Sequence, residues 1–446
     1  MHKLDTIKNI YFIGIGGIGM SALARYFVSK GCVVSGYDKT ETALTKSLSD
    51  IGIQIHYEDS LDLIDKNASV VVYTPAIPAS HHELNYYRDN GYEVVKRSDV
   101  LGWITEGTTN ICVAGTHGKT TVSTMIAHIL RDSGYGCSAF LGGIAANYNT
   151  NFWSSSNNVV VVEADEYDRS FLKLSPSVAV ITSMDADHLD IYGDTATIEA
   201  SFIEFANKIT DKSQLFISNE LPIEGVTCAV NQEAIYTATN IRIMGSEYVF
   251  DVKTSSETIV NIKFGLPGKH NLMNALMALA MAKTFGLPNE DIASALFSFK
   301  GIKRRFSYQI KTEKLVYIDD YAHHPTEINA VHQAVRELYP DKKVLAIFQP
   351  HLFSRTNDFA DDFAKSLAAF DEIILLDIYP ARELPMPGIT SQWLLEKINN
   401  SAKKLITKEM LIPTILQSDA TVIVTIGAGD IGELVPSIKK ALNETL

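Results

Sequence analysis

A glycine-rich segment ending in Gly-Lys-Thr gives this sequence its clearest chemical signal. Residues 114–121 read AGTHGKTT and lie between an apolar run, Asn110–Ala114, and a helical pattern, Val122–Arg131. In such a loop the backbone N–H groups cradle phosphates, the lysine reaches the β- and γ-phosphate oxygens, and the hydroxyl binds Mg²⁺. Val113 occupies the place of the first glycine in the strict pattern, so the motif is a shortened P-loop. We predict that a nucleoside triphosphate binds Gly115, Thr116, His117, Gly118, Lys119, Thr120 and Thr121.

Acidic residues that could hold the metal follow two later strand-like runs. Val159–Glu163 leads into Glu163-Ala164-Asp165-Glu166, and a carboxylate at the carboxyl end of a parallel strand points into the ligand crevice. Glu163, the first of these acids, is the predicted metal ligand, although a solvated acidic cluster would have the same pattern. His188 follows the run Val178–Thr182. Spacing alone leaves His188 either a second metal ligand or a loop cap, since Mg²⁺ prefers oxygen ligands.

The chain opens with another glycine loop. Gly14–Gly19 reads GIGGIG, follows the strand-like run Asn9–Ile13 and precedes a helical pattern over Met20–Lys30. The glycines let the backbone approach a pyrophosphate at the helix N-terminus, and Asp38 stands where a ribose-binding acid is expected. We predict nucleotide binding here rather than a tight turn without a ligand. The pattern leaves NAD, FAD and a UDP-sugar open.

Short apolar runs alternate with helical patterns along almost the whole chain, which predicts an α/β fold of parallel sheets covered by helices. The order strand, glycine-rich turn, helix occurs at Gly14, Gly115 and Gly427. At roughly 150 residues per domain, the 446 residues predict about three domains, which we place at 1–107, 108–309 and 310–446. Short antiparallel strands are expected within residues 236–264. The other predicted strands are Cys32–Gly36, Val70–Tyr73, Gln214–Ser218, Leu315–Ile318, Val344–Phe348, Glu372–Asp377 and Thr421–Ile426.

The composition excludes several classes of protein. Lysine and arginine number 39 against 52 aspartates and glutamates, a net charge of −13, which argues against a nucleic-acid partner. Four widely spaced cysteines form no C-x-x-C pair, so a reducing compartment is expected. The sequence holds no apolar run long enough to span a bilayer and no signal-peptide layout. We expect a soluble, cytoplasmic protein without membrane insertion, and the oligomeric state stays open.

Nine segments, taken in order, match one known family. The chain resembles the Mur ligases, the ATP-dependent amide-forming enzymes of peptidoglycan precursor synthesis, over essentially its full length. Any one segment is modest support, whereas the ordered set is strong. The matching segments are Gly14–Ala22, Gly115–Thr121, Glu163–Tyr167, Asp187–Asp190, Gly268–Asn274, Gly301–Phe306, Asp319–Glu327, Phe348–Thr356 and Gly427–Ile431.

The resemblance implies a role for each domain. The N-terminal Rossmann-like domain holds the UDP part of a sugar nucleotide, the central P-loop domain with its small antiparallel β part is the ATPase, and the C-terminal Rossmann-like domain brings an amino acid. The implied UDP-sugar residues are Gly14, Gly16, Gly17, Ile18, Gly19, Met20, Ser21 and Asp38. The implied residues near the adenine and ribose of ATP are His270, Asn271 and Asn274. Apart from the resemblance, Arg304 and Arg305, just before the second domain boundary, are expected to clamp the ATP phosphates when the C-terminal domain closes. The implied metal ligands are Thr120, Glu163 and His188, with Mg²⁺ as the ion and Mn²⁺ as an alternative.

Asn271 also fits a plain helix N-cap ahead of the apolar run Leu272–Ala282.

The catalytic residues implied in the ATPase domain are Lys119, Glu163 and His188. In the C-terminal domain, Arg355 suits a carboxylate through bidentate pairing. His323 and His351 are expected to orient the amine or accept its proton, and Tyr321 lies in the same segment. For the segment His323-His324-Pro325 the alternative is a helix start, with Pro325 in the first turn, and His324 is left undecided.

Two positions depart from the family pattern. Several Mur ligases carry a carbamylated lysine after the DHLD-type motif, and here Ile203 falls near that place. Its absence favours the member that adds L-alanine. A basic residue often follows FQPH, but here Leu352 stands there, so Arg355 must carry more of the carboxylate contact.

The expected activity is ATP-dependent joining of L-alanine to the lactoyl carboxylate of UDP-N-acetylmuramate through an acyl phosphate. The alternatives are a recycling ligase that joins a preformed tripeptide to the same sugar nucleotide, or a sister ligase that adds another amino acid. An NAD-dependent oxidoreductase would leave the Gly-Lys-Thr loop without a role. A nucleotide-binding switch would need an N-K-x-D element, and residues 207–210 read NKIT.

Overall fold

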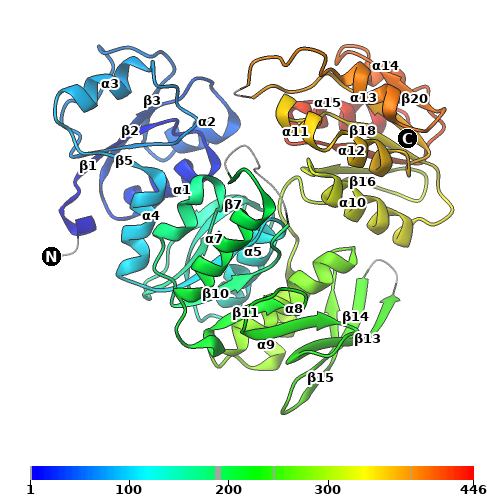
Figure 1. Cartoon of the computed structure of the whole chain (residues 1–446), viewed down its shortest axis with the longest axis horizontal. Coiled ribbons are helices and arrows are strands. Elements are labelled where there is room, and N and C mark those ends of the chain that lie inside the picture. Colours follow the sequence, from blue (N-terminus) through cyan, green and yellow to red (C-terminus); the bar gives the residue numbers. More distant parts are fainter. Residues whose placement is uncertain (1–2, 186–191, 245–246, 382) are drawn as a thin grey trace. The chain divides into compact units, whose positions relative to one another are not determined.

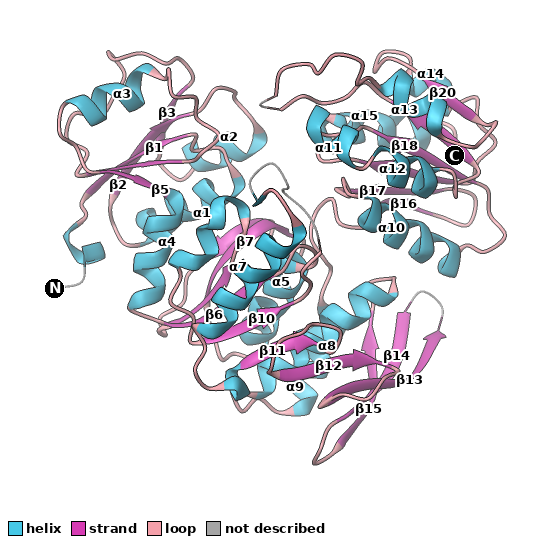
Figure 2. Ribbon diagram, viewed as in Figure 1, coloured by secondary structure: helices cyan, strands magenta, loops and turns pink. Residues whose placement is uncertain are grey.

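The computed structural model describes residues 3–185, 192–244, 247–381 and 383–446 (Figure 1). Their strands form sheets of mostly parallel strands with helices packed against them (Figure 2), so the architecture is the predicted three-domain α/β fold. His188 lies outside the described residues. Among the residues described, none of the helices is long and apolar enough to cross a bilayer, and all four cysteines are free thiols.

The N-terminal sheet is parallel throughout and has the strand order β3-β2-β1-β4-β5. The chain reverses its direction of progress between β1 and β4, and in such sheets ligands bind at the carboxyl ends of the strands next to this switch point. The strands are β1 (Asn9–Ile13), β2 (Val33–Tyr37), β3 (Gln54–His56), β4 (Val70–Tyr73) and β5 (Val94–Lys96). The helices are η1 (Lys3–Thr6), α1 (Ile18–Ser29), α2 (Ala43–Ser49), α3 (His82–Asp89) and α4 (Arg97–Glu106).

The central sheet has ten strands in the order β15-β14-β13-β12-β11-β10-β6-β9-β7-β8. The strands around β6 pair in parallel. They are rich in valine and isoleucine, and both faces of these strands are buried. The strands are β6 (Thr109–Ala114), β7 (Ser138–Ala145), β8 (Thr150–Trp153), β9 (Val159–Glu163), β10 (Val178–Ile181), β11 (Leu215–Ser218), β12 (Val226–Val230), β13 (Tyr236–Met244), β14 (Glu247–Lys253) and β15 (Thr258–Phe264). The helices are α5 (Lys119–Asp132), η2 (Tyr167–Lys173), α7 (Thr195–Asn207), η3 (Lys212–Gln214), α8 (Lys269–Lys283) and α9 (Asn289–Ser298).

The antiparallel strands predicted within residues 236–264 are confirmed for β14 and β15, which pair antiparallel. The strand before them, β13, pairs parallel with β12 and so continues the main sheet. The antiparallel part is therefore an extension of the ATPase-like sheet rather than a separate layer.

The C-terminal sheet has the strand order β16-β17-β21-β18-β19-β20 and is parallel apart from β16. The strands are β16 (Ser307–Lys311), β17 (Val316–Asp320), β18 (Val344–Phe348), β19 (Glu372–Leu375), β20 (Lys403–Leu405) and β21 (Val422–Ile426). The helices are α10 (Pro325–Leu338), α11 (Phe353–Asp358), α12 (Ala360–Leu367), α13 (Ser391–Lys397), α14 (Leu411–Ile415) and α15 (Ile431–Asn443).

Packing divides the chain into two compact units. The first holds the N-terminal and central sheets, and the second holds residues 266–272 and 301–446. The start of α8 therefore belongs to the second unit and the rest of the helix to the first. The domain boundaries at residues 107 and 309 stay predictions.

Candidate active site

The Gly-Lys-Thr loop joins β6 to α5, as the sequence indicates. Helix α5 begins at Lys119, three residues before the predicted start at Val122, so Lys119, Thr120 and Thr121 form its first turn. The first-turn N–H groups of a helix have no intrahelical acceptor and favour anions. Gly115 and Gly118 have φ angles of +133° and +85°, which residues with a Cβ rarely adopt. The backbone is thus open toward a phosphate at the positive end of α5.

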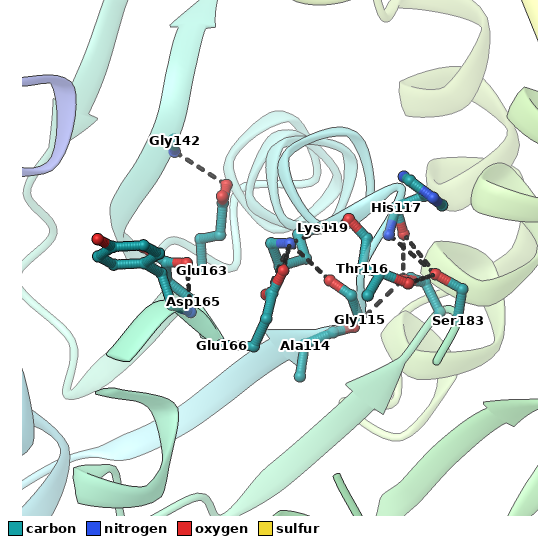
Figure 3. A network of polar contacts seen from close by, with 12 residues as sticks. Ala114, Gly115, Thr116, His117, Lys119, Gly142, Glu163, Asp165, Glu166 and Ser183 are labelled. Carbon is teal, nitrogen blue, oxygen red and sulfur yellow. Dashed lines mark hydrogen bonds and ion pairs between the residues drawn. The ribbon is translucent and has the colours of Figure 1, made fainter. Parts of the chain in front are cut away.

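Residues that follow β10 hold the phosphate loop in place (Figure 3). The His117 N–H donates to the Ser183 hydroxyl at 2.9 Å, and the hydroxyls of Thr116 and Ser183 lie 2.9 Å apart. The Thr182 hydroxyl donates to the His117 carbonyl. Because β10 is the parallel neighbour of β6, these contacts fix the loop before any nucleotide binds.

Lys119 lies across the loop and reaches a buried acid (Figure 3). Its ammonium donates to the Gly115 carbonyl at 2.6 Å and to Glu166 Oε1 at 2.9 Å. Burial alone would lower the Lys119 pKa, but the charges of Glu166, Asp165 and Glu163 outweigh it and raise that pKa. Burial raises the pKa of the Glu166 carboxyl to about 7, although Lys119 opposes the shift. Lys119 therefore keeps its charge at the phosphate loop, and Glu166 holds the ammonium in place.

Glu163, the predicted metal ligand, stands at the carboxyl end of β9. Its Oε2 accepts a hydrogen bond from the Gly142 N–H at 3.1 Å (Figure 3). The strands β9 and β6 pair in parallel with Glu163 opposite Val113, so the carboxylate lies at the same sheet edge as the phosphate loop. A carboxylate and the Thr120 hydroxyl are hard oxygen donors of the kind that Mg²⁺ takes. The metal assignment stays a prediction, because the described residues hold no cluster of three acidic, histidine or cysteine ligands.

The first glycine loop lies at the switch point of the N-terminal sheet. Gly17 caps α1 without a side-chain hydrogen bond, and the backbone amides of Ile18, Gly19 and Met20 belong to the first turn, where the helix favours an anion. Asp38 accepts a hydrogen bond from the Gly16 N–H at 2.7 Å and one from the Thr40 N–H at 3.2 Å. In this structure Asp38 braces the loop, and its contact with a ribose stays a prediction.

Ser21 faces the central domain rather than the loop. Its hydroxyl donates to the Ile18 carbonyl at 2.8 Å and accepts from the Asn151 amide at 2.9 Å. The Asn151 amide also donates to the Ile18 carbonyl at 2.6 Å. Ser21 thereby joins α1 to β8, which is a structural role that its place in the motif did not indicate.

A cavity of about 310 Å³ opens between the first glycine loop and the acids after β9. Glu163 and Asp165 line it on the side of the central domain. Thr74 and Ala76 line it from the loop after β4, and Arg97 lines it from α4. The cavity therefore runs from the predicted pyrophosphate loop to the predicted metal ligand.

The predicted adenine and ribose residues fall at the start of α8. Helix α8 begins at Lys269, so the alternative in which Asn271 caps the helix is wrong. The Asn271 amide instead donates to the Pro267 carbonyl at 2.7 Å. Asn274 lies next to the phosphate loop: a Cβ added to Gly118 would be 2.8 Å from Asn274 Oδ1. His270 is exposed.

The second unit brings together the predicted amino-acid residues. The rings of His323 and His351 lie 6.0 Å apart, and the His323 Nδ1 and the Tyr321 carbonyl are 3.0 Å apart. Tyr379, which the sequence did not indicate, stacks on His351 at 5.8 Å. Arg355 is buried at 7% exposure on α11.

His324, the undecided histidine of this segment, caps α10. Its Nδ1 accepts from the Thr326 N–H at 3.3 Å, so the helix-start interpretation applies to His324. Leu352 is buried and its backbone has a φ of +70°. It therefore offers no charge to a carboxylate, and the carboxylate contact of Arg355 stays a prediction.

Arg304 and Arg305 are held within the second unit. Arg304 Nη2 donates to the Gly427 carbonyl at 2.6 Å, and Arg305 Nη1 donates to Glu327 at 3.2 Å. Both guanidinium groups lie over the Tyr321 ring, at 5.1 and 5.4 Å from its centroid. Their phosphate contact stays a prediction, and the structure shows them next to the amino-acid residues.

Comparisons with known proteins match the whole chain. Three family models match it: "Mur ligase family, catalytic domain" at residues 9–109, "Mur ligase middle domain" at 113–282, and "Mur ligase, glutamate ligase domain" at 304–429. The chain is 64% identical over 448 residues to the UDP-N-acetylmuramate–L-alanine ligase of Flavobacterium johnsoniae, covering 100% of both chains.

Solved structures agree with this result. The UDP-N-acetylmuramate-alanine ligase of Thermotoga maritima superposes with a TM-score of 0.84 at 28% identity, covering 99% of this chain and 100% of that one. A murein peptide ligase of Psychrobacter arcticus has the same fold, with a TM-score of 0.72 at 23% identity over 98% of this chain and 99% of that one.

Three α/β domains, a shortened P-loop and the matched models define the chain as an ATP-dependent ligase. The full-length matches then specify which ligases it is related to. The chain belongs to the Mur ligase family.

Proposed function

We propose that this chain joins L-alanine to the lactoyl carboxylate of UDP-N-acetylmuramate, with ATP converted to ADP and phosphate, in the synthesis of peptidoglycan precursors. The observation that carries the proposal is the 64% identity, over both full lengths, to a relative with that name. The phosphate loop supports it, because Lys119 and the first turn of α5 are already arranged to receive a triphosphate.

The first step would transfer the γ-phosphoryl group of ATP to the lactoyl carboxylate. The product is an acyl phosphate, a good leaving group, together with ADP. Phosphoryl transfer depends on positioning and on neutralising charge. Lys119 supplies a fixed positive charge for this purpose, and the N–H groups of Gly118 and Lys119 lie at the positive end of α5.

A divalent cation completes the proposed phosphate site. Thr120, Glu163 and His188 would hold Mg²⁺, with Mn²⁺ as an alternative. When bound, the ion would neutralise charge on the phosphate oxygens. The oxygen donors of Thr120 and Glu163 suit either ion.

In the second step the amine of L-alanine would attack the acyl carbon, and the tetrahedral intermediate would collapse to the amide and release phosphate. Arg355 would pair with the alanine carboxylate. His323 and His351 would orient the amine or take up its proton, since an imidazole has a suitable pKa. The buried Leu352 adds an apolar wall rather than a charge. This sequence of steps fits a cytoplasmic enzyme with soluble substrates.

A phosphate-release assay tests the proposal directly. Phosphate released from ATP is measured with UDP-N-acetylmuramate and, in turn, single amino acids or a preformed tripeptide. Release that requires both the sugar nucleotide and L-alanine is the expected result. Release with the tripeptide alone would move the chain to the recycling ligase, and release with another amino acid alone would make it a sister ligase.

A further inference from the structure

Arg97 is a cation at the first glycine loop that the motif does not contain. It is the first residue of α4, which follows β5 directly, and its side chain lies over Gly19. A Cβ built on Gly19 would lie 2.5 Å from Arg97 Nη1. The last glycine of the loop is therefore the place where a guanidinium group approaches the first turn of α1.

Arg97 and the start of α1 face the same cavity. Gly17, Ile18, Gly19 and Met20 line the 310 Å³ space together with Arg97. The uncapped amides of α1 and the guanidinium are both positive, so their fields add at one place. The carboxylates of Glu163 and Asp165 line the other side of the same space, so an anion would bind on the side of Arg97 and the first turn of α1.

One carboxylate holds the Arg97 guanidinium group but does not use all of its hydrogen-bond donors. Arg97 Nη2 donates to Asp165 Oδ2 at 3.1 Å, and Asp165 Oδ1 accepts from the Tyr167 N–H at 3.1 Å. Within the described ranges, Asp165 is the one hydrogen-bond acceptor of Arg97, whereas a guanidinium carries five N–H donors. The remaining N–H donors are available to a ligand, and the hydrogen bond to Asp165 sets the orientation of the guanidinium group.

We propose that Arg97 binds the diphosphate of the sugar nucleotide, together with the first turn of α1, and that Asp165 positions it. This inference rests on the proposed function for the identity of the sugar. A planar guanidinium fork matches phosphate oxygens bidentately, which a lysine cannot do. The contact is made to the diphosphate, so it is the same for UDP and for UDP-N-acetylmuramate.

Equilibrium binding in the absence of ATP tests this contact. Titration calorimetry would compare UDP and UDP-N-acetylmuramate on wild type, Arg97→Ala and Arg97→Lys. We expect Arg97→Ala to weaken both ligands by the same factor, about 10- to 100-fold for a lost charge-assisted contact, with Arg97→Lys in between. An affinity within twofold of wild type, or a loss confined to UDP-N-acetylmuramate, would overturn the proposal.

Lys96→Ala is the matched control. Lys96 precedes Arg97 and pairs with Asp168 at 2.6 Å across the same joint, but it does not line this cavity. We expect wild-type affinity for both ligands from Lys96→Ala. If Arg97→Ala fails to fold, as thermal unfolding would show, Arg97→Lys decides the result. The two proposals can fail separately. If UDP affinity depends on Arg97 but phosphate release does not depend on L-alanine, this inference is retained and the proposed function is rejected.

Discussion

Alanine substitutions at three glycines distinguish a specific role in phosphate binding from the backbone strain that alanine causes at any left-handed glycine. Gly118 has a φ of +85°, and an added Cβ would lie 2.8 Å from Asn274 Oδ1. Gly134, just beyond the other end of α5, has a φ of +77° and meets nothing within 4 Å. Gly134→Ala therefore carries the backbone penalty alone, and Gly118→Ala carries the same penalty together with a clash in the loop.

The geometry gives a magnitude for each substitution. A residue with a Cβ in the left-handed region costs about 1–2 kcal/mol, partly offset because alanine restricts the unfolded chain. We expect a loss of about 1 kcal/mol for Gly134→Ala. The end of the Asn274 side chain would have to shift, and because Asn274 is buried this crowding adds about 1–3 kcal/mol for Gly118→Ala. At about 3 °C per kcal/mol, Tm would fall by about 3 °C for Gly134→Ala and about 6–12 °C for Gly118→Ala.

Gly115→Ala is the most severe of the three. Its Cβ would lie 2.1 Å from Thr182 Oγ1 and 2.9 Å from the Ser183 backbone nitrogen, which cannot give way as a side chain can. We expect this variant to lose more stability than Gly118→Ala. Gly115 lies in the first compact unit, so thermal unfolding of this variant should show a lower Tm for the first unit and an unchanged Tm for the second.

The decisive assay is ATP binding by titration calorimetry, alongside thermal unfolding. Displacing one amide from a phosphate costs a charge-assisted hydrogen bond, so ATP should bind Gly118→Ala about 10- to 100-fold more weakly than wild type. Gly134→Ala should bind ATP normally. Equal ATP affinity in Gly118→Ala and Gly134→Ala would refute the assignment of this loop as the phosphate cradle.

Four further predictions concern charged groups. Lys119→Ala should fold yet lose at least about 10²- to 10³-fold in turnover, and near-wild-type ADP release would contradict the role of Lys119. Glu166 has a folded pKa raised to about 7, so the stability that its protonation gives is complete below the unfolded value of 4.5 and is lost as the pH rises through 7. The Tm of wild type minus that of Glu166→Gln should therefore decrease from pH 5 to pH 8, and a constant difference would oppose this reasoning. Arg355→Lys should raise KM for L-alanine about tenfold or more and leave KM for UDP-N-acetylmuramate unchanged, because lysine lacks the bidentate fork; an unchanged alanine KM would place the carboxylate elsewhere. Chelation should abolish phosphate release until Mg²⁺ is restored, and Glu163→Gln should raise the Mg²⁺ concentration needed; indifference of that variant to Mg²⁺ would remove Glu163 from the metal site.

Strand prediction succeeded where a strand is buried on both faces. Asn9–Ile13, Val70–Tyr73, Val159–Glu163 and Val344–Phe348 have the predicted bounds, because such strands are continuous runs of apolar, β-branched residues. The three-residue strands β3, β5 and β20 were missed, since they are partly exposed and too short to show a period. Strand β7 was missed because Gly142 and Gly143 interrupt its apolar run.

Local chemistry also explains why the start of α5 was placed too late. Lys119, Thr120 and Thr121 are polar, so they resemble a loop more than a helix. In the structure they are helical because the left-handed Gly118 begins the helix, Thr120 and Thr121 are buried, and Lys119 is held by Glu166. Asn271 shows the reverse error, since a favourable N-cap residue lies inside α8 and bonds to Pro267.

The sequence by itself determined the α/β class, the two glycine loops and the family, since each of these depends on residues that are contiguous or in fixed order. Only the tertiary structure decided which side chains meet. Lys119 pairs with Glu166, Ser183 braces His117, and Arg97 pairs with Asp165, across separations of 47, 66 and 68 residues. Such pairs depend on which strands become neighbours and on where each strand ends, because parallel pairing brings carboxyl ends from distant parts of the chain to one edge. Neither spacing nor residue type carries that information.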